Sequence, residues 1–150
     1  MTNCGAKKSV WVTGAGKGIG RALSRRLSED GWLVHACART MTDLESLSAE
    51  CPADRIIPHV LDITDEAATR AVLSAIENQS GVPDLAVLNA GTHLPNLAAE
   101  LKIKPFRDLM ETNYMGTVSG LVLIQERMRA QGKGHIAVVS SLAGYRGLPG

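Results

Sequence analysis

VWVTGAGKGIGRAL, residues 10–23, joins an apolar strand pattern to a helix pattern through a loop that holds four glycines. Glycine permits a tight turn and a close approach of the backbone, and the N-terminus of a following helix offers free N–H groups and partial positive charge. In a parallel α/β sheet such a loop binds a nucleotide phosphate. The alternative is a glycine-rich turn without a ligand, which the strand–loop–helix order disfavours.

The rest of the chain alternates short apolar runs with longer segments of helical period. Five strands are expected, at residues 9–13, 32–37, 55–60, 84–89 and 134–140. Helices are expected from Gly18, Thr42, Thr64 and Pro105 onward. Strands that read as continuous apolar runs are buried on both faces, as in a sheet covered by helices on each side. The sequence therefore predicts an α/β fold with a doubly wound, Rossmann-like parallel sheet.

Local signals mark the helix starts. Thr42 and Thr64 precede acidic residues and are expected to cap their helices, while Pro105 is expected to open the last long helix, where its missing N–H costs nothing. Along that helix an apolar stripe can serve a core, a subunit interface or both. The stripe comprises Phe106, Leu109, Met110, Val118, Leu121, Val122 and Met128.

Charge and length narrow the classes of function. The chain has 150 residues, enough for one domain, with 16 Lys and Arg against 15 Asp and Glu. No basic tract indicates binding to nucleic acid or to an anionic membrane surface. The apolar run near the N-terminus, VWV, is too short for a signal peptide or a membrane span. A small-molecule ligand and a cytoplasmic location are expected.

Cysteines and histidines show no metal-site or disulfide pattern. The three cysteines lack CxxC spacing and are expected to be free thiols in a reducing compartment; they are Cys4, Cys37 and Cys51. The four histidines fall in different predicted elements and are expected to be structural or on the surface; they are His35, His59, His93 and His135. No metal site is predicted.

Spacing in the glycine loop selects among nucleotide-binding folds. A GxGxxG motif starting at Gly14 would need glycine at position 19, and a phosphate loop of the Walker type would need Ser or Thr at position 18. The motif that fits is TGxxxGxG over residues 13–20, and with it the chain resembles the short-chain dehydrogenase/reductase family over essentially its whole length. The resemblance implies that the loop binds the dinucleotide through Gly14, Gly16, Lys17, Gly18, Ile19 and Gly20.

The end of the second strand selects the cofactor in this family. NAD-preferring members carry an acid there, whereas this chain has Ala38 followed by Arg39. A guanidinium offers planar, charge-assisted hydrogen bonds to a 2′-phosphate, and Lys17 adds a second positive charge. Taken alone, each residue could also be an ordinary charged side chain exposed to solvent. Together, with the acid absent, they favour NADP over NAD.

Further residues match the family motifs that surround the cofactor. The resemblance implies that Asp62 and Ile63 contact the adenine, although Asp62 also fits an acid near the next helix cap. The family motif NNAG stands here as LNAG, so its first asparagine is lost. Asn89, Ala90 and Gly91 remain, and by resemblance they lie against the cofactor ribose.

Two residues match catalytic positions of the family. Asn113 lies inside the last long helix, although asparagine is a poor helix former. The resemblance implies that Asn113 loosens the helix and helps hold a water of the proton relay; an ordinary polar residue is the alternative. Ser141, before LAG, resembles the serine that hydrogen-bonds the substrate carbonyl oxygen. Its neighbour Ser140 is expected to point elsewhere, given the alternation of a strand.

The remaining catalytic pair of the family is the tyrosine and lysine of YxxxK, whose spacing places both on one helix face. Tyr145 has Pro149 four positions later and is rejected as the general acid. We expect residues 1–150 to be an NADP-binding Rossmann domain truncated before the YxxxK helix, and inactive alone. The expected parent is an NADP-dependent oxidoreductase that transfers a hydride to or from a carbonyl or alcohol substrate, homo-oligomeric in its full-length form. The alternative is a non-catalytic NADP(H)-binding module or a truncated inactive variant.

Overall fold

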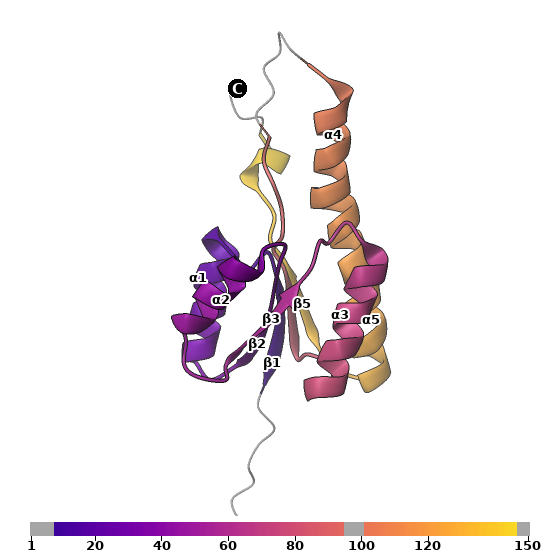
Figure 1. The fold of residues 1–150 in the computed structure, drawn as a ribbon. Helices are drawn as coiled ribbons and strands as arrows, with labels where there is room; N and C mark the ends of the chain where they lie inside the picture. The colour runs from indigo at the N-terminus through magenta and orange to yellow at the C-terminus, as the bar shows by residue number, and fades with distance from the viewer. Residues whose placement is uncertain (1–7, 95–100, 147–150) are drawn as a thin grey trace, which may run out of the picture.

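The computed structural model describes residues 8–94 and 101–146, which build a parallel sheet between two layers of helices (Figure 1). The five strands are β1 Ser9–Thr13, β2 Leu33–Ala38, β3 Ile56–Val60, β4 Leu85–Leu88 and β5 His135–Val138. Helices α1 (Gly18–Glu29) and α2 (Met41–Ala49) cover one face, and α3 (Glu66–Ser80) and α5 (Gly116–Gln131) cover the other. The predicted doubly wound α/β fold is confirmed.

The strand order, β3-β2-β1-β4-β5, reverses direction after β3. β1 therefore lies in the middle, with β2 on one side and β4 on the other, and pairs Val10 with Leu85 and Val12 with Val87. In a doubly wound sheet the crevice for a ligand opens where the order reverses, outside the carboxyl ends of the strands. Here that point lies beyond the carboxyl ends of the neighbouring strands β1 and β4.

Alternation along β1 divides the core into two clusters. Trp11 faces α3 and α5, while Val10 and Val12 face α1 and α2. The first cluster contains Trp11, Cys37, Leu61, Leu73, Ile76, Ala86, Leu88, Leu123, Ile124 and Met128. The second contains Val10, Val12, Ala15, Val34, Ala36, Leu44, Leu47, Ile56 and Val87. Burial on both faces explains why β1, β2 and β4 read as continuous apolar runs, whereas β3 and β5, at the edges of the sheet, are partly exposed.

Three helix starts differ from the expected ones. α2 begins at Met41, because Thr40 already has the extended backbone of a cap residue, so Thr42 lies inside the first turn. The cap of α3 is Asp65, whose carboxylate accepts a hydrogen bond from Ala68 N at 2.9 Å, whereas the Thr64 hydroxyl donates to Asp62. The last helix opens with α4, Ile103–Met110, two residues before the proline. Pro105 still lies in the first turn, where its missing N–H is tolerated.

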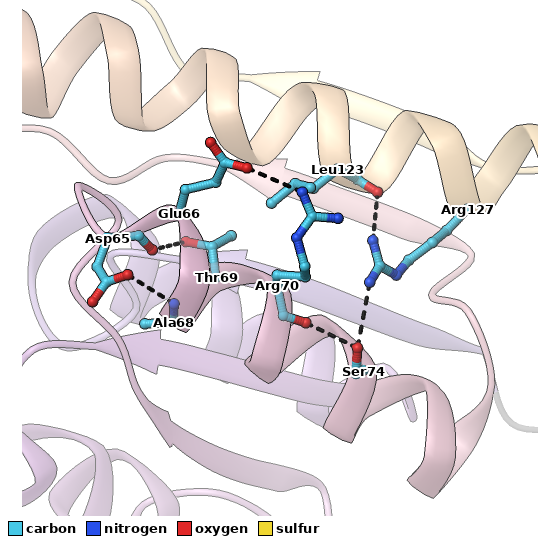
Figure 2. A network of polar contacts seen from close by, with 8 residues as sticks. All are labelled: Asp65, Glu66, Ala68, Thr69, Arg70, Ser74, Leu123 and Arg127. Atoms are coloured by element: carbon cyan, nitrogen blue, oxygen red, sulfur yellow. Dashed lines mark hydrogen bonds and ion pairs between the residues drawn. The ribbon is translucent and has the colours of Figure 1, made fainter.

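Polar contacts fasten α3 to α5 on the outer side of the first cluster (Figure 2). The Arg127 guanidinium donates to Leu123 O at 2.9 Å and to Ser74 Oγ at 3.4 Å, and it pairs with Glu77 at 3.4 Å. Figure 2 also shows the ion pair between Glu66 and Arg70, within α3. Because Arg127 is mostly buried, its contacts with Ser74 and Glu77 fix how the two helices lie against each other.

The apolar stripe of the last long helix is split between core and surface. Met128 is buried, and Leu109 and Val118 are half-buried, whereas other members are exposed. The exposed ones are Phe106, Met110, Leu121 and Val122. In the described ranges, no helix is long and apolar enough to cross a membrane.

Buried polar groups on β2 are satisfied by neighbours. His35 is fully buried, with Nδ1 3.1 Å from His59 Nε2 and Nε2 2.7 Å from Ser80 Oγ. Trp11 donates its indole N–H to the Cys37 sulfur at 3.1 Å, and burial raises the pKa of that thiol to about 12. Cys37 and Cys51 are free thiols. Cys4 lies outside the described residues.

Candidate active site

The glycine loop packs the start of α1 against the end of β1. Gly14 has φ +69°, in the region that favours glycine, and a Cβ there would lie 2.8 Å from Ala90 Cα. A Cβ on Gly20 would collide with the carbonyl oxygen of Gly14 and with the Asn89 side-chain nitrogen. A Cβ on Gly18, in contrast, would meet nothing within 4 Å. The loop is therefore closed toward the sheet and open on its outer side.

The N-terminus of α1 suits an anion. Lys17 precedes the helix in an extended conformation, its side chain makes no cap hydrogen bond, and the first turn carries no acid. The first N–H groups of a helix have no intrahelical partner, so those of Gly18, Ile19 and Gly20 are available to a ligand. This open cradle of donors fits the phosphates of a dinucleotide.

Thr13 and Asn89 lock the ends of β1 and β4 together. Thr13 Oγ1 accepts hydrogen bonds from the backbone N–H groups of Asn89 and Ala90, both at 3.0 Å. The Asn89 amide donates to Thr13 O at 3.0 Å and to Gly14 O at 3.3 Å. The Asn89 amide nitrogen therefore holds the glycine loop in place. Contact between the Asn89–Gly91 segment and a ribose stays a prediction.

The charged residues that are expected to contact the adenosine part of the cofactor follow β1, β2 and β3 in the chain. Arg39 follows β2 and is exposed, and Lys17 pairs with Asp43 at 3.5 Å. Asp62 Oδ1 accepts hydrogen bonds from the backbone N–H of Thr64 at 3.0 Å and from its hydroxyl at 2.8 Å. These bonds and the positive charge of Arg39 hold the pKa of Asp62 below its usual value. Thr64 is therefore the main partner of the Asp62 carboxylate.

Ile63 contributes packing through its side chain. A Cβ on Gly116, the first residue of α5, would lie 2.8 Å from Ile63 Cδ1 and 3.0 Å from Ile63 O. The side chain thus fills the space beside the start of α5. Its predicted contact with an adenine stays a prediction.

Asn113 lies in a π-helical turn, Glu111–Met115, between α4 and α5. Its amide forms two hydrogen bonds with the backbone of Thr92: Oδ1 accepts from N at 2.7 Å, and Nδ2 donates to O at 2.8 Å. The α-helical hydrogen-bond pattern is therefore interrupted at Asn113, and a π turn inside an α-helix often marks a functional site. The side chain fastens the segment after β4 to the long helix; its part in a proton relay stays a prediction.

Ser141 lies beyond the last strand. β5 ends at Val138, so strand alternation does not separate Ser140 from Ser141 as expected. Ser141 instead caps a 3₁₀ turn, Leu142–Gly144, and its Oγ accepts a hydrogen bond from Ala143 N at 3.1 Å. In Figure 1 this turn, drawn in yellow, and α4 both rise beyond the carboxyl edge of the sheet. Tyr145 follows the turn and is exposed.

Arg21 was not predicted as a site residue, but it holds the glycine loop in position. Its guanidinium donates to Gly16 O at 3.2 Å and to Asp43 O at 2.9 Å, and it pairs with Glu50 at 2.8 Å. The glycine loop is thereby tied to α2. Arg21 and Asp43 are 22 positions apart in the chain, so no local sequence pattern could predict this contact.

In residues 8–94 and 101–146, no group of three or more His, Cys, Asp or Glu side chains is placed to hold a metal. The candidate site lies at the carboxyl edge of the sheet. It comprises the glycine loop, the ends of β2 to β4, the π turn and Ser141.

A family model described as short chain dehydrogenase matches residues 8–150. The chain belongs to the short-chain dehydrogenase family. Its match to that family covers the glycine loop, the ends of the strands, Asn113 and Ser141.

Other proteins resemble this chain in sequence and in structure. An uncharacterized oxidoreductase of Myxococcus xanthus is 35% identical over 145 residues, which are 95% of this chain and 57% of the relative. The D-erythrulose reductase of Gallus gallus is 38% identical over 138 residues, 91% of this chain and 54% of the relative. The solved structure "ElxO with NADP Bound" has a TM-score of 0.87 and 28% identity, covering 95% of this chain and 59% of that one. The chain thus spans a little more than half the length of these proteins.

Proposed function

We propose that residues 1–150 form the NADP(H)-binding domain of an oxidoreductase that transfers a hydride between NADP(H) and a carbonyl or alcohol substrate. The observation that carries the choice of NADP is the positive pair Arg39 and Lys17, with Ala38 where an acid would bind the ribose hydroxyls of NAD. A neighbour of similar fold, ElxO, is described as bound to NADP. This likeness supports the same cofactor class here.

Each part of the loop has a proposed role in binding. The N–H groups at the start of α1 receive the pyrophosphate, and the open side of Gly18 leaves room for it. Arg39 and Lys17 bind the 2′-phosphate through charge-assisted hydrogen bonds, each worth about 1.5–3 kcal/mol. Arg21 and Asn89 hold the loop in shape from the two sides.

The remaining contacts orient the cofactor. Asp62 accepts from the adenine amine, the backbone of Ile63 lies along the ring, and the Asn89–Gly91 segment borders the ribose. NADP(H) bound in this way would supply or accept the hydride.

Ser141 is the proposed substrate-orienting residue. Because its Oγ accepts from Ala143 N, the hydroxyl proton is free to donate to the substrate oxygen. Asn113 is proposed to support a water of the proton relay. Tyr114 and Tyr145 have valine and proline four positions later, so neither forms a YxxxK pair. We assign the proton-transfer step to a tyrosine and lysine of the whole protein outside residues 1–150.

The assembly and location of the whole protein are part of the proposal. Exposed apolar side chains such as Phe106, Met110 and Val122 on the long helix support a homo-oligomer. The cytoplasm is the proposed compartment, because the cysteine pattern favours reducing conditions.

The proposed cofactor preference predicts a difference in affinity between two nucleotides. Wild-type protein is expected to bind NADPH at least about tenfold more tightly than NADH, since the 2′-phosphate adds charge-assisted bonds. Titration of each nucleotide, followed by its fluorescence, gives the two dissociation constants. Equal affinities would contradict the role of Arg39 and Lys17.

Reversing the charge at Arg39 tests that role directly. Arg39→Asp is expected to weaken NADPH binding by tenfold or more, because one bond is lost and a repulsive charge is gained. The affinity for NADH is expected to stay the same or to increase. Arg25→Asp, an exposed change on α1 beyond the loop, is the matched control and should leave both affinities unchanged. Equal losses for both nucleotides in Arg39→Asp would contradict the assignment.

A further inference from the structure

Lys17 is not a free charge, because it forms an ion pair with Asp43 on α2. The distance from Lys17 Nζ to Asp43 Oδ2 is 3.5 Å. The two ends differ in exposure: the lysine side chain is 81% exposed and the aspartate side chain 28%. Any anion that approaches Lys17 therefore meets a carboxylate that is held closer to the protein.

The position of Asp43 is fixed by its surroundings. Its backbone oxygen accepts a hydrogen bond from Arg21, and the same guanidinium nitrogen donates to Gly16 O. A Cβ on Gly16 would lie 3.1 Å from the Cβ atoms of both Asp43 and Ala38. Asp43 thus lies where the glycine loop, the end of β2 and the start of α2 meet. This is the corner in which Lys17 and Arg39 flank the proposed 2′-phosphate.

We propose that Asp43 is a specificity-determining residue that lowers the preference of this site for NADPH over NADH. The inference rests on the proposed function, since it needs a dinucleotide bound at the glycine loop. The Asp43 carboxylate competes with the 2′-phosphate for Lys17 and repels it. Toward a 2′-hydroxyl, the same carboxylate is a hydrogen-bond acceptor, which Ala38 cannot be.

This role differs from that of the acid in NAD-preferring members of the family. That acid occupies the end of the second strand, where this chain has Ala38. Asp43 instead comes from the first turn of α2 and reaches the same corner through its contact with Gly16. The ion pair with Asp43 therefore partly cancels the positive charge of Lys17 in this corner.

Asp43→Asn is the decisive variant, because it removes the charge and keeps the size of the side chain. The ratio of the NADH to the NADPH dissociation constant is expected to rise about fivefold at low ionic strength. NADPH should bind more tightly, and NADH should bind equally or more weakly. The rise should shrink as salt is added, because these side chains are solvent-accessible and their charges are screened. Fluorescence titration at low and high salt measures both effects.

Controls separate a local charge effect from a change in folding. Asp30→Asn removes a similar exposed ion pair at the far end of α1 and should not change the ratio. Asp43→Ser, a second neutral variant, should raise the ratio as Asp43→Asn does. In Lys17→Met protein, Asp43→Asn should raise the ratio less, because competition for the lysine is gone. Circular dichroism spectra confirm that each variant is folded.

The outcomes distinguish this inference from the proposed function. An unchanged or lowered ratio in both Asp43 variants would overturn the role of Asp43, even if wild-type protein binds NADPH more tightly. A wild-type preference for NADH would overturn the cofactor assignment, while a raised ratio in the variants would still support Asp43. Wild-type protein that binds neither nucleotide would overturn both.

Discussion

Gly20→Ala is expected to destabilise the fold by about 3 kcal/mol, the upper end of the range for forced overpacking. The added Cβ would collide with the Gly14 carbonyl oxygen and the Asn89 amide. Neither group can move freely, because Asn89 also bonds Thr13 and thereby ties β4 to β1. Displacement of α1 would also shift the N–H groups proposed for the pyrophosphate. NADPH binding should therefore be lost. Urea denaturation and nucleotide titration measure the two effects.

Gly144→Ala is the matched control for this substitution. A Cβ on Gly144 would meet nothing within 4 Å, and its φ is not in the left-handed region. Stability and binding should stay close to those of wild type. If Gly20→Ala were as stable as Gly144→Ala, the close contact between α1 and β1 would not be a constraint on this fold.

Acid is expected to weaken the fold through His35 well before the carboxylates titrate. Burial and the neighbouring His59 lower the pKa of His35 to about 4 from the usual value of 6.5. Between these pH values the unfolded state binds more protons, so stability is full above pH 6.5 and falls as the pH drops toward 4. The loss from this residue between pH 7 and pH 5 is about 2 kcal/mol. Urea denaturation at stepped pH values gives the slope.

Two variants isolate the contribution of His35 to this slope. His35→Gln should flatten the dependence of unfolding free energy on pH in this window, whatever its effect on stability at pH 7. His93→Gln, at an exposed position, should leave the slope unchanged. A His35→Gln protein with the wild-type slope would show that the titrating group lies elsewhere, with His59, whose pKa is also lowered by burial, as the next residue to replace.

Much of the fold could be predicted because local patterns coincide with tertiary burial. The strand around Trp11 is apolar on both faces because a layer of helices covers each face of the sheet. Helix α1 begins at Gly18, as the glycine motif indicates. Helix starts were less predictable where two polar residues compete. Thr64 was expected to cap α3, but its hydroxyl donates to Asp62, which leaves Asp65 as the cap.

The sequence pointed to candidate site residues but not to the groups that contact them. Motif spacing indicated Lys17, Asn89 and Asn113, yet the sequence carried no sign that Lys17 pairs with Asp43. It likewise gave no sign that the Asn113 amide is bound to the backbone of Thr92, 21 positions away. Such contacts depend on how the sheet brings distant loops to one edge. Local periodicity does not encode that arrangement.

The central place of β1 in the sheet has a consequence for how the chain is made. β1 leaves the ribosome well before its partner β4, because the contact between Ser9 and Asp84 spans 75 positions of the chain. At ordinary rates of synthesis this separation corresponds to about 4–15 s. During that interval one edge of a strand that is buried along its whole length has no native partner. We therefore expect co-translational folding to begin with β1–α1–β2–α2–β3, and β4 to pair with the open edge of β1 afterwards.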